Sequence, residues 1–186
     1  TVTYNHHFGT PVGWRNLSRL REAFDVPLHV KTVDPTVVRR IVRSTLIQLG
    51  SVYWHAIAGQ TALPVQIAVQ KRIPLVIWGA HQGLEQVGMF SHLDEVEMSR
   101  RNRKEHDLMG VEAKDLLNGH GELTERDVLA FEYPADSDLM AVGTRGIYLG
   151  NFVRWDPLAQ SHAMAQQFGL EGASLPRTFD PYDHVD

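Results

Sequence analysis

A continuous apolar run before Gly79 constrains the fold of this chain more than any other feature. Ile73 and Pro74 lead into Leu75–Trp78, which contains no polar residue. A strand with one solvated face alternates apolar and polar residues, whereas a strand covered on both faces reads as an unbroken apolar run. The run therefore predicts a strand of a parallel sheet that is covered on both faces.

The segments before this strand alternate between strand and helix patterns. Residues 2–4 and 27–33 are predicted as strands, and residues 13–26 and 35–49 as helices. Residues 51–72 are predicted as a helical region that is interrupted near Pro64. This order is typical of an α/β fold with a doubly wound, mostly parallel sheet. We expect residues 1–83 to form this α/β core and residues 84–186 a mainly helical part.

Local signals place further elements in the second part of the chain. Residues 92–110 are charged and predicted as helical, and residues 145–155 contain a short strand or extended segment. Thr124 and Asp127 have the spacing of a helix-capping pair. Asp156 followed by proline predicts the start of a helix that Gly169 can end.

Composition excludes several classes of protein. The 186 residues contain no cysteine, so disulfides and thiolate metal sites are excluded. The net charge of -4 gives no indication of a general nucleic-acid binder. No apolar run approaches the ~20 residues of a membrane helix, and no signal peptide is recognised. We therefore expect a cytoplasmic protein that binds neither nucleic acid nor membrane.

Polar residues follow two of the predicted strands. Asn5, His6 and His7 come after the first strand, and residues 79–82 come after the apolar run. Ligands of open α/β sheets bind beyond the carboxyl ends of strands. The sequence contains no Walker loop, GxGxxG, HExxH or GxSxG motif, and its histidines lack metal-ligand spacing, so no metal site is predicted. His81 is as consistent with a structural role as with a catalytic one.

Four stretches together resemble one family. They are TYNHHFGTPVGWRNL, YWHAIAGQTALPVQIAVQKRIPLVIWG, GMFSHLDEVEMSRRNRKEH and GTRGIYLGNFVRWD, in this order between residues 3 and 156. They are similar to N-acetyl sugar amidotransferases of bacterial surface-polysaccharide synthesis, which are PP-loop ATP pyrophosphatases with an adenine-nucleotide α-hydrolase-like fold. The resemblance covers most of the chain.

The resemblance implies a reaction and its participants. ATP adenylates the oxygen of a sugar N-acetyl group, pyrophosphate leaves, and ammonia displaces AMP to give an acetamidino sugar for lipopolysaccharide or flagellin glycans. Adenylation makes a poor leaving group into a good one, and the charge on the α-phosphate requires preorganised donors and Mg²⁺. ATP and Mg²⁺ are thus the implied cofactors. The implied partners are a sugar-nucleotide substrate and the glutaminase and cyclase-like subunits that supply ammonia.

The resemblance also implies roles for residues of this chain. The nucleotide-binding candidates are Tyr4, Asn5, His6 and Gly79, and the catalytic candidates are His81 and Gln82. The candidates for binding the sugar substrate are Arg15, Asn16, Trp54, His55, Arg145 and Arg154. For each arginine a solvated surface position is an equal alternative, and Trp54 and His55 fit a core aromatic beside a hydrogen-bonded imidazole equally well.

This chain departs from the family pattern in several ways, which include Ile57 in place of a common histidine and Ala80 in place of a frequent acidic residue. The family has a first strand, a Ser-Gly-Gly phosphate loop and a cysteine-rich segment before the strand that ends in TYNH, and this sequence contains none of them. Tyr53 and Ala56 replace the cysteines that flank the Trp-His pair. We expect this chain to be a C-terminal portion of such an enzyme, a shortened form of it or a product of gene decay. The alternative is a catalytically inactive nucleotide-binding or subunit-docking module; a tRNA-thiolating enzyme is disfavoured.

Overall fold

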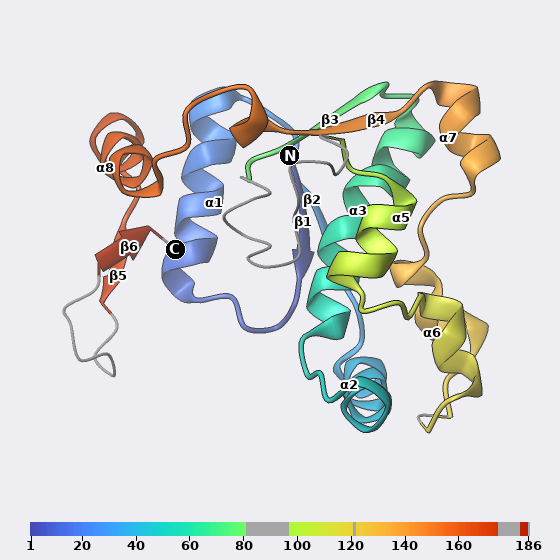
Figure 1. Cartoon of the computed structure of the whole chain (residues 1–186). Helices are drawn as coiled ribbons and strands as arrows, with labels where there is room; N and C mark the ends of the chain where they lie inside the picture. The colour runs from blue at the N-terminus through green and yellow to red at the C-terminus, as the bar shows by residue number, and fades with distance from the viewer. Residues whose placement is uncertain (81–96, 121, 175–182, 186) are drawn as a thin grey trace. The chain divides into compact units, whose positions relative to one another are not determined.

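The computed structural model describes residues 1–80, 97–120, 122–174 and 183–185 (Figure 1). They form two compact units. The α1/α8 unit comprises Thr1, His7–His29 and the described part of Trp155–Asp186, and the α3 unit comprises Val2–His6 and the described part of Val30–Arg154. These units do not coincide with a division at residue 83, because the α1/α8 unit combines segments from both ends of the chain.

The α3 unit contains most of the elements. Its strands and longer helices are β1 (Val2–Asn5), β2 (His29–Thr32, whose first residue falls in the other unit), α2 (Pro35–Leu49), α3 (Trp54–Lys71), β3 (Leu75–Trp78), α7 (Asp136–Val142) and β4 (Arg145–Tyr148). Its short helical segments are α5 (Arg100–Asn102), the π-helix η1 (Arg103–Asp107), the 3₁₀ segments η2 (Ala113–Asn118), η3 (Leu129–Phe131) and η4 (Leu149–Asn151), and α6 (Glu125–Val128).

Several predicted helix ends are confirmed. Asp34 caps α2 by accepting a hydrogen bond from the backbone N–H of Thr36 at 2.7 Å, and Gly50 ends the helix with a φ of 68°. The backbone N–H of Thr124 donates to Asp127 Oδ2 at 2.8 Å at the start of α6. These short side chains satisfy backbone groups that a helix terminus leaves without partners.

Helix α3 is the central element of its unit. It packs against β1, β3, α2, α7, η1 and η3. The prediction of an interruption near Pro64 is wrong, because α3 continues through this residue. Proline removes one helical hydrogen bond, but the buried side chains of Ala58, Ala62, Val65 and Ala68 lie on both sides of it and hold the two halves in one helix.

The described strands of the α3 unit form two separate pairs. β1 pairs with β2, and β3 pairs with β4 in a parallel register that sets Leu75 opposite Arg145 and Trp78 opposite Tyr148. Both pairs are parallel. The predicted strands at residues 2–4 and 75–78 and the α/β class are thus confirmed, whereas a single doubly wound sheet is not found among the described strands.

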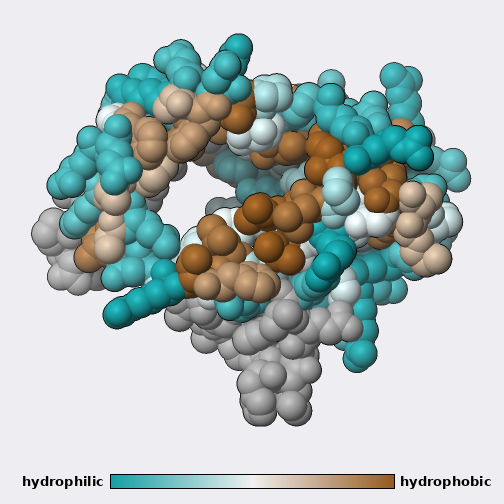
Figure 2. All heavy atoms as spheres, turned by 90° about the horizontal axis from the view of Figure 1, so that it is seen from above, coloured by the Kyte–Doolittle hydropathy of each residue, from teal (hydrophilic) through white to brown (hydrophobic). Residues whose placement is uncertain are grey.

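The expectation that β3 is covered on both faces is wrong. Leu75 and Ile77 point to one face and are 47% and 57% exposed. Val76 points to the other face, toward Val65 of α3 and the α7 residue Leu139, which line a cavity with it. Figure 2, which looks down on the side of this unit that carries β3 and β4, shows apolar side chains gathered there. Among the described residues, this apolar run is therefore covered on one face only.

The α1/α8 unit contains α1 (Pro11–Phe24), α8 (Pro157–Phe168) and the antiparallel pair β5 (Gly172–Ser174) and β6 (Asp183–Val185). The rings of Phe24 and Phe168 pack with their centroids 4.9 Å apart. Asp156 caps α8 as predicted, since its Oδ1 accepts from Ala159 N at 3.0 Å, and Gly169 ends the helix with a φ of 65°.

None of the described helices combines the length and the apolar character that crossing a bilayer requires.

Candidate functional site

The carboxyl ends of β1 and β2 are tied to each other by their side chains. Asn5 is the last residue of β1, and its Nδ2 donates a hydrogen bond to Oγ1 of Thr32, the last residue of β2, at 3.3 Å. Strand ends of this kind are where open α/β sheets bind ligands. Of the predicted nucleotide-binding residues, Asn5 therefore lies at a position suited to that role, and the half-buried His6 follows it.

A cavity of about 870 Å³ opens beside the end of β2, between α2, α3 and α6. We name it the β2 cavity. Its apolar lining residues are Val33, Val37, Leu63, Ile67, Leu129 and Ala130. Its polar lining residues are Lys31, Thr32, Asp34, Thr36, Gln66, Gln70, Arg126 and Asp127.

The walls of the β2 cavity are held by hydrogen bonds. Gln66 Nε2 donates to the carbonyl oxygens of Leu129, at 3.3 Å, and of Glu132, at 2.7 Å, which fixes η3 to α3. Hydrogen bonds from the Thr36 hydroxyl and backbone hold the pKa of Asp34 below its ordinary value. Hydrogen bonds from Thr124, together with the nearby Arg40 guanidinium, likewise hold the pKa of Asp127 below its ordinary value.

The exposed Lys31 and Arg126 add two positive charges to a lining that also contains the carboxylates of Asp34 and Asp127. The cavity thus offers apolar surface for a flat ring, bounded by fixed polar groups, with two cations for a negatively charged tail. Pockets that bind small molecules combine a mainly apolar lining with a few placed polar groups in this way.

Tyr4 does not line this cavity. Its side chain is buried against α3, and its hydroxyl lies 3.3 Å from His55 Nδ1. Burial raises the pKa of Tyr4, so the phenol stays protonated at neutral pH. The predicted adenosine contact would need this ring to leave the core.

Trp54 and His55 are fully enclosed at the start of α3. Trp54 Nε1 donates to the carbonyl oxygen of Val111 at 3.0 Å, and its ring packs against Phe131. Trp54 and His55 therefore match the alternative interpretation given for them, a core aromatic residue beside a hydrogen-bonded imidazole.

The remaining predicted site residues do not gather in the β2 cavity. Arg145 pairs with Glu97, which raises the pKa of the Arg145 guanidinium through a hydrogen bond, and Arg154 is exposed. Gly79 is exposed, and a side chain there would meet nothing within 4 Å. His81 and Gln82, which carry the catalytic prediction, lie outside the described residues.

Arg15 and Asn16 belong to the α1/α8 unit. Arg15 pairs with Glu171 at 2.5 Å. The buried side chain of Asn16 donates from Nδ2 to the backbone carbonyl of Glu171 and accepts from its N–H, both at 2.9 Å. Both residues thus fasten the segment after α8 onto α1.

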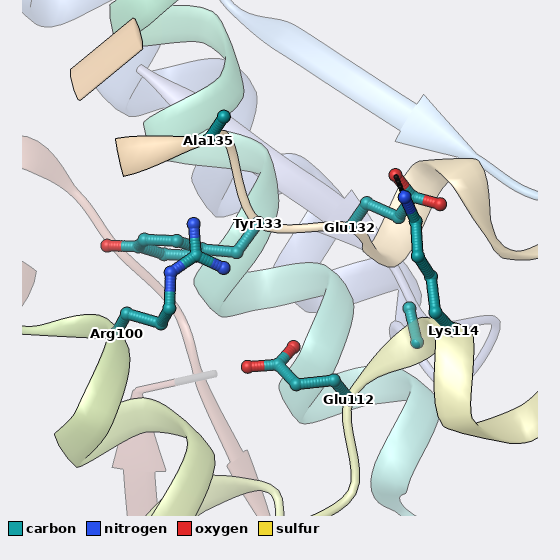
Figure 3. A pocket seen from close by; sticks show the side chains of 7 residues that line it. Arg100, Glu112, Lys114, Glu132, Tyr133 and Ala135 are labelled. Atoms are coloured by element: carbon teal, nitrogen blue, oxygen red, sulfur yellow. Dashed lines mark ion pairs between the residues drawn. The ribbon is translucent and has the colours of Figure 1, made fainter. Parts of the chain in front are cut away.

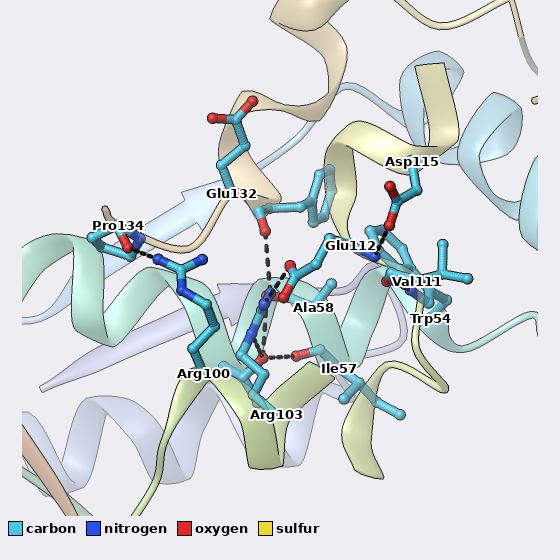
Figure 4. Close-up of polar contacts among 12 residues, drawn as sticks. Trp54, Ile57, Ala58, Arg100, Arg103, Val111, Glu112, Asp115, Glu132 and Pro134 are labelled. Atoms are coloured by element: carbon cyan, nitrogen blue, oxygen red, sulfur yellow. Dashed lines mark hydrogen bonds and ion pairs between the residues drawn. The ribbon is translucent and has the colours of Figure 1, made fainter. Parts of the chain in front are cut away.

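Sequence reasoning missed a buried arginine in the α3 unit. Arg103 has no exposed side-chain surface, although it lies in a stretch that is charged throughout. Its Nε donates to Thr61 Oγ1 and its Nη1 to Glu112 Oε2, both at 2.8 Å, and its Nη2 donates to the Phe131 carbonyl at 3.2 Å (Figure 4). The guanidinium also lies 5.0 Å from the centroid of the Tyr133 ring. No spacing in SRRNR distinguishes this arginine from its neighbours.

Next to this network lies a smaller cavity of about 300 Å³. We name it the Glu112 pocket; it is lined by Arg100, Glu112, Ala113, Lys114, Glu132, Tyr133 and Ala135 (Figure 3). It brings two cations and two carboxylates to one aromatic wall.

Comparison with known proteins adds no assignment: no family model matches the chain, and no curated protein is significantly similar to it.

Proposed function

We propose that the chain is part of an ATP-dependent N-acetyl sugar amidotransferase of the PP-loop type, and that the β2 cavity holds the adenosine of ATP. The sequence resemblance between residues 3 and 156 suggests the reaction. The observation that carries the nucleotide assignment is the position of the β2 cavity, because it opens at the carboxyl end of a parallel strand pair.

The lining of the β2 cavity supports a nucleotide as its occupant. Val37, Leu63 and Ile67 offer apolar surface to a purine, and Lys31 and Arg126 offer charge to the phosphates. Asn5, tied to Thr32 at the edge of the cavity, provides an amide for the ribose or the base. In this arrangement the chain binds and orients the nucleotide.

The described residues provide no all-protein site for the implied Mg²⁺, which nucleotide-binding proteins hold with one or two carboxylates and the phosphates of the nucleotide. The described residues contain no group of three His, Asp or Glu side chains placed to hold a metal ion. The sequence also has no Ser-Gly-Gly loop, whose backbone N–H groups would hold the departing pyrophosphate. We therefore propose no metal-dependent step for these residues, and we expect weak ATP binding and negligible turnover by the chain alone.

The second candidate is a nucleotide-binding or subunit-docking module of the same fold without catalytic activity. The enclosure of Trp54 and His55 favours it, because it removes two of the predicted substrate contacts from solvent. In this case the glutaminase and cyclase-like subunits would be docking partners rather than suppliers of ammonia to this chain.

ATP titration tests the nucleotide site, and pyrophosphate release tests the reaction. We expect saturable binding of ATP to the chain, weaker by at least about 10-fold in Lys31→Ala/Arg126→Ala, because a single hydrogen bond to a charged group contributes about 1.5–3 kcal/mol. Lys104→Ala, which removes an exposed cation outside the β2 cavity, should bind as the unchanged chain does. Unchanged affinity in the double variant would refute the assignment of the β2 cavity.

The reaction is tested with a chain that is preceded by the family's phosphate-loop segment. With ammonia, Mg²⁺ and an N-acetylated sugar nucleotide, this extended chain should release pyrophosphate at least 100-fold faster than the chain alone, since losing even one preorganised donor costs ~10²–10³ in rate. Equal rates would show that the loop argument is wrong. ATP binding without pyrophosphate release in either form would favour the inactive module.

A further inference from the structure

Gln66 of α3 holds its side-chain amide in one fixed orientation in the wall of the β2 cavity. Its Nε2 donates to the carbonyl oxygens of Glu132, at 2.7 Å, and of Leu129, at 3.3 Å. Carbonyl oxygens only accept hydrogen bonds, so the end of the amide that contacts both of them must be the NH₂ group. Turning the amide over would set oxygen against oxygen, and Gln66 Oε1 is therefore fixed as an acceptor.

The oxygen of this amide is available to a ligand. Gln66 is half-buried and lines the β2 cavity. None of the described residues donates a hydrogen bond to Gln66 Oε1, and this atom is not among the fully buried polar atoms that lack a partner. It is thus an accessible acceptor whose direction the protein has already set.

Gln70 lies one turn further along α3 and lines the same cavity, but its amide can turn. Its side chain is exposed and makes no hydrogen bond with the residues that the structure describes. Rotation about its last side-chain bond exchanges the donor and the acceptor. Gln70 can therefore match either a donor or an acceptor of a ligand, whereas Gln66 matches only a donor.

The spacing of the lining residues on α3 suits the edge of a neutral ring. One face of the helix, at the i, i+3, i+4, i+7 spacing, presents apolar and amide side chains together: Leu63, Gln66, Ile67 and Gln70. The apolar groups offer contact to the face of a ring, and the uncharged amides offer hydrogen bonds to its edge. The charged lining residues Lys31 and Arg126 lie on β2 and α6 instead.

We propose that Gln66 determines which purine the β2 cavity accepts, by taking a hydrogen bond from an exocyclic amino group of the ring. The proposal rests on the proposed function, in which this cavity holds a nucleotide. Adenine carries such an amino group where hypoxanthine and guanine carry a carbonyl oxygen. A carbonyl oxygen facing Gln66 Oε1 would bring two acceptors together with no proton between them, so the oxo purines are disfavoured.

The test compares ATP with inosine triphosphate (ITP) as ligands of the full chain by NMR titration. ITP has hypoxanthine in place of adenine and the same ribose and triphosphate, so the contacts of Lys31 and Arg126 cancel in the comparison. We expect ATP to bind at least about 10-fold more tightly than ITP, because a site rejects an analogue that leaves its polar groups unpaired.

Two variants locate the discrimination. Gln66→Met keeps the length of the side chain and removes its acceptor. Because this change also removes the bonds that fix η3, the readout is the ratio of the ATP and ITP affinities, which should fall to about 1, and not either affinity alone. Gln70→Met is the matched control: it removes an amide that fits both purines, so both affinities should fall together and the ratio should stay as in the unchanged chain.

Equal affinities for ATP and ITP in the unchanged chain, or an unchanged ratio in Gln66→Met, overturn the role of Gln66 and leave the nucleotide assignment intact. Loss of the preference in Gln70→Met alone also overturns it and assigns the discrimination to Gln70. Absence of saturable binding by both nucleotides refutes the β2 cavity as a nucleotide site, and the role of Gln66 with it.

Discussion

The ring of Tyr4 lies directly over Gly59 of α3, so close that a Cβ atom at residue 59 would come within 2.6 Å of Tyr4 Cγ. A glycine here lets β1 approach the helix, and the hydroxyl of the same ring reaches His55 one turn earlier on α3. The contact joins the first strand of the α3 unit to its central helix.

Gly59→Ala should destabilise the protein. The rigid Tyr4 ring must shift to admit the new methyl group, which costs about 1–3 kcal/mol, while alanine regains about 1 kcal/mol in helix propensity. We expect a net loss of up to about 2 kcal/mol in the free energy of unfolding, measured by urea titration. The control is Gln60→Ala, at the exposed neighbour on the same helix, which should stay within about 0.5 kcal/mol of the unchanged protein.

Tyr4→Phe distinguishes a core role from a nucleotide contact. Removing the hydroxyl deletes its hydrogen bond with His55 and should lower the free energy of unfolding by about 1 kcal/mol. ATP affinity should be unchanged, because Tyr4 lies outside the lining of the β2 cavity. If ATP affinity falls by more than the smaller fraction of folded protein explains, the Tyr4 phenol contacts the nucleotide, as the sequence resemblance implies.

Arg103→Met should be among the most destabilising single changes. It leaves Glu112 without its charged partner and the Thr61 hydroxyl and Phe131 carbonyl without a donor, and breaking a buried ion pair from one side costs about 3–5 kcal/mol. Chemical denaturation measures the loss. Arg101→Met removes a guanidinium that is 83% exposed two residues away, and should cost less than about 0.5 kcal/mol. Equal effects of the two changes would contradict the network.

The pairing of Glu171 with two arginines should make the α1/α8 unit sensitive to acid. Hydrogen bonds from Arg15, together with Arg19, lower the pKa of Glu171 from 4.5 to about 2. Because the pKa is lowered in the folded protein, its stabilisation is present above pH 4.5 and is lost as the pH falls toward 2. We expect a ¹³C NMR titration of the carboxyl group to give a pKa well below 4.5.

The control for this prediction is Arg15→Gln/Arg19→Gln. In this variant the pKa of Glu171 should return toward its ordinary value, and added salt should shift it less than in the unchanged protein. If the double change leaves the pKa of Glu171 where it was, the two arginines are not its cause.

Local signals predicted much of the fold because they act within a few residues. Asp34, Thr124 and Asp156 cap helices through their own side chains, so their role can be read from neighbouring sequence. The predictions for Pro64 and for the run Leu75–Trp78 were wrong because they depend on packing: α3 continues through Pro64 with buried residues on both sides of it, and the described residues cover one face of β3.

The candidate site was harder to predict, since side-chain function depends on which residues meet. Asn5 was placed correctly at a strand end, because the strand pattern itself marks that position. Arg103 and Glu112 meet through the π-helix and the turn that follows it, and no periodicity marks such a contact. The cations of the β2 cavity, Lys31 and Arg126, come from segments about a hundred residues apart and carry no motif.

The position of α3 determines how the α3 unit should lose its structure. Strand pairs β1–β2 and β3–β4 do not pair with each other among the described strands, yet both pack on this helix. Opening α3 would leave both strand pairs without the helix on which they pack. A state in which only one side of the unit is open would therefore have little free-energy advantage over the unfolded unit. Amide hydrogens in the buried middle of α3 should therefore exchange with solvent only through cooperative unfolding of the whole unit, with protection equal to its global stability.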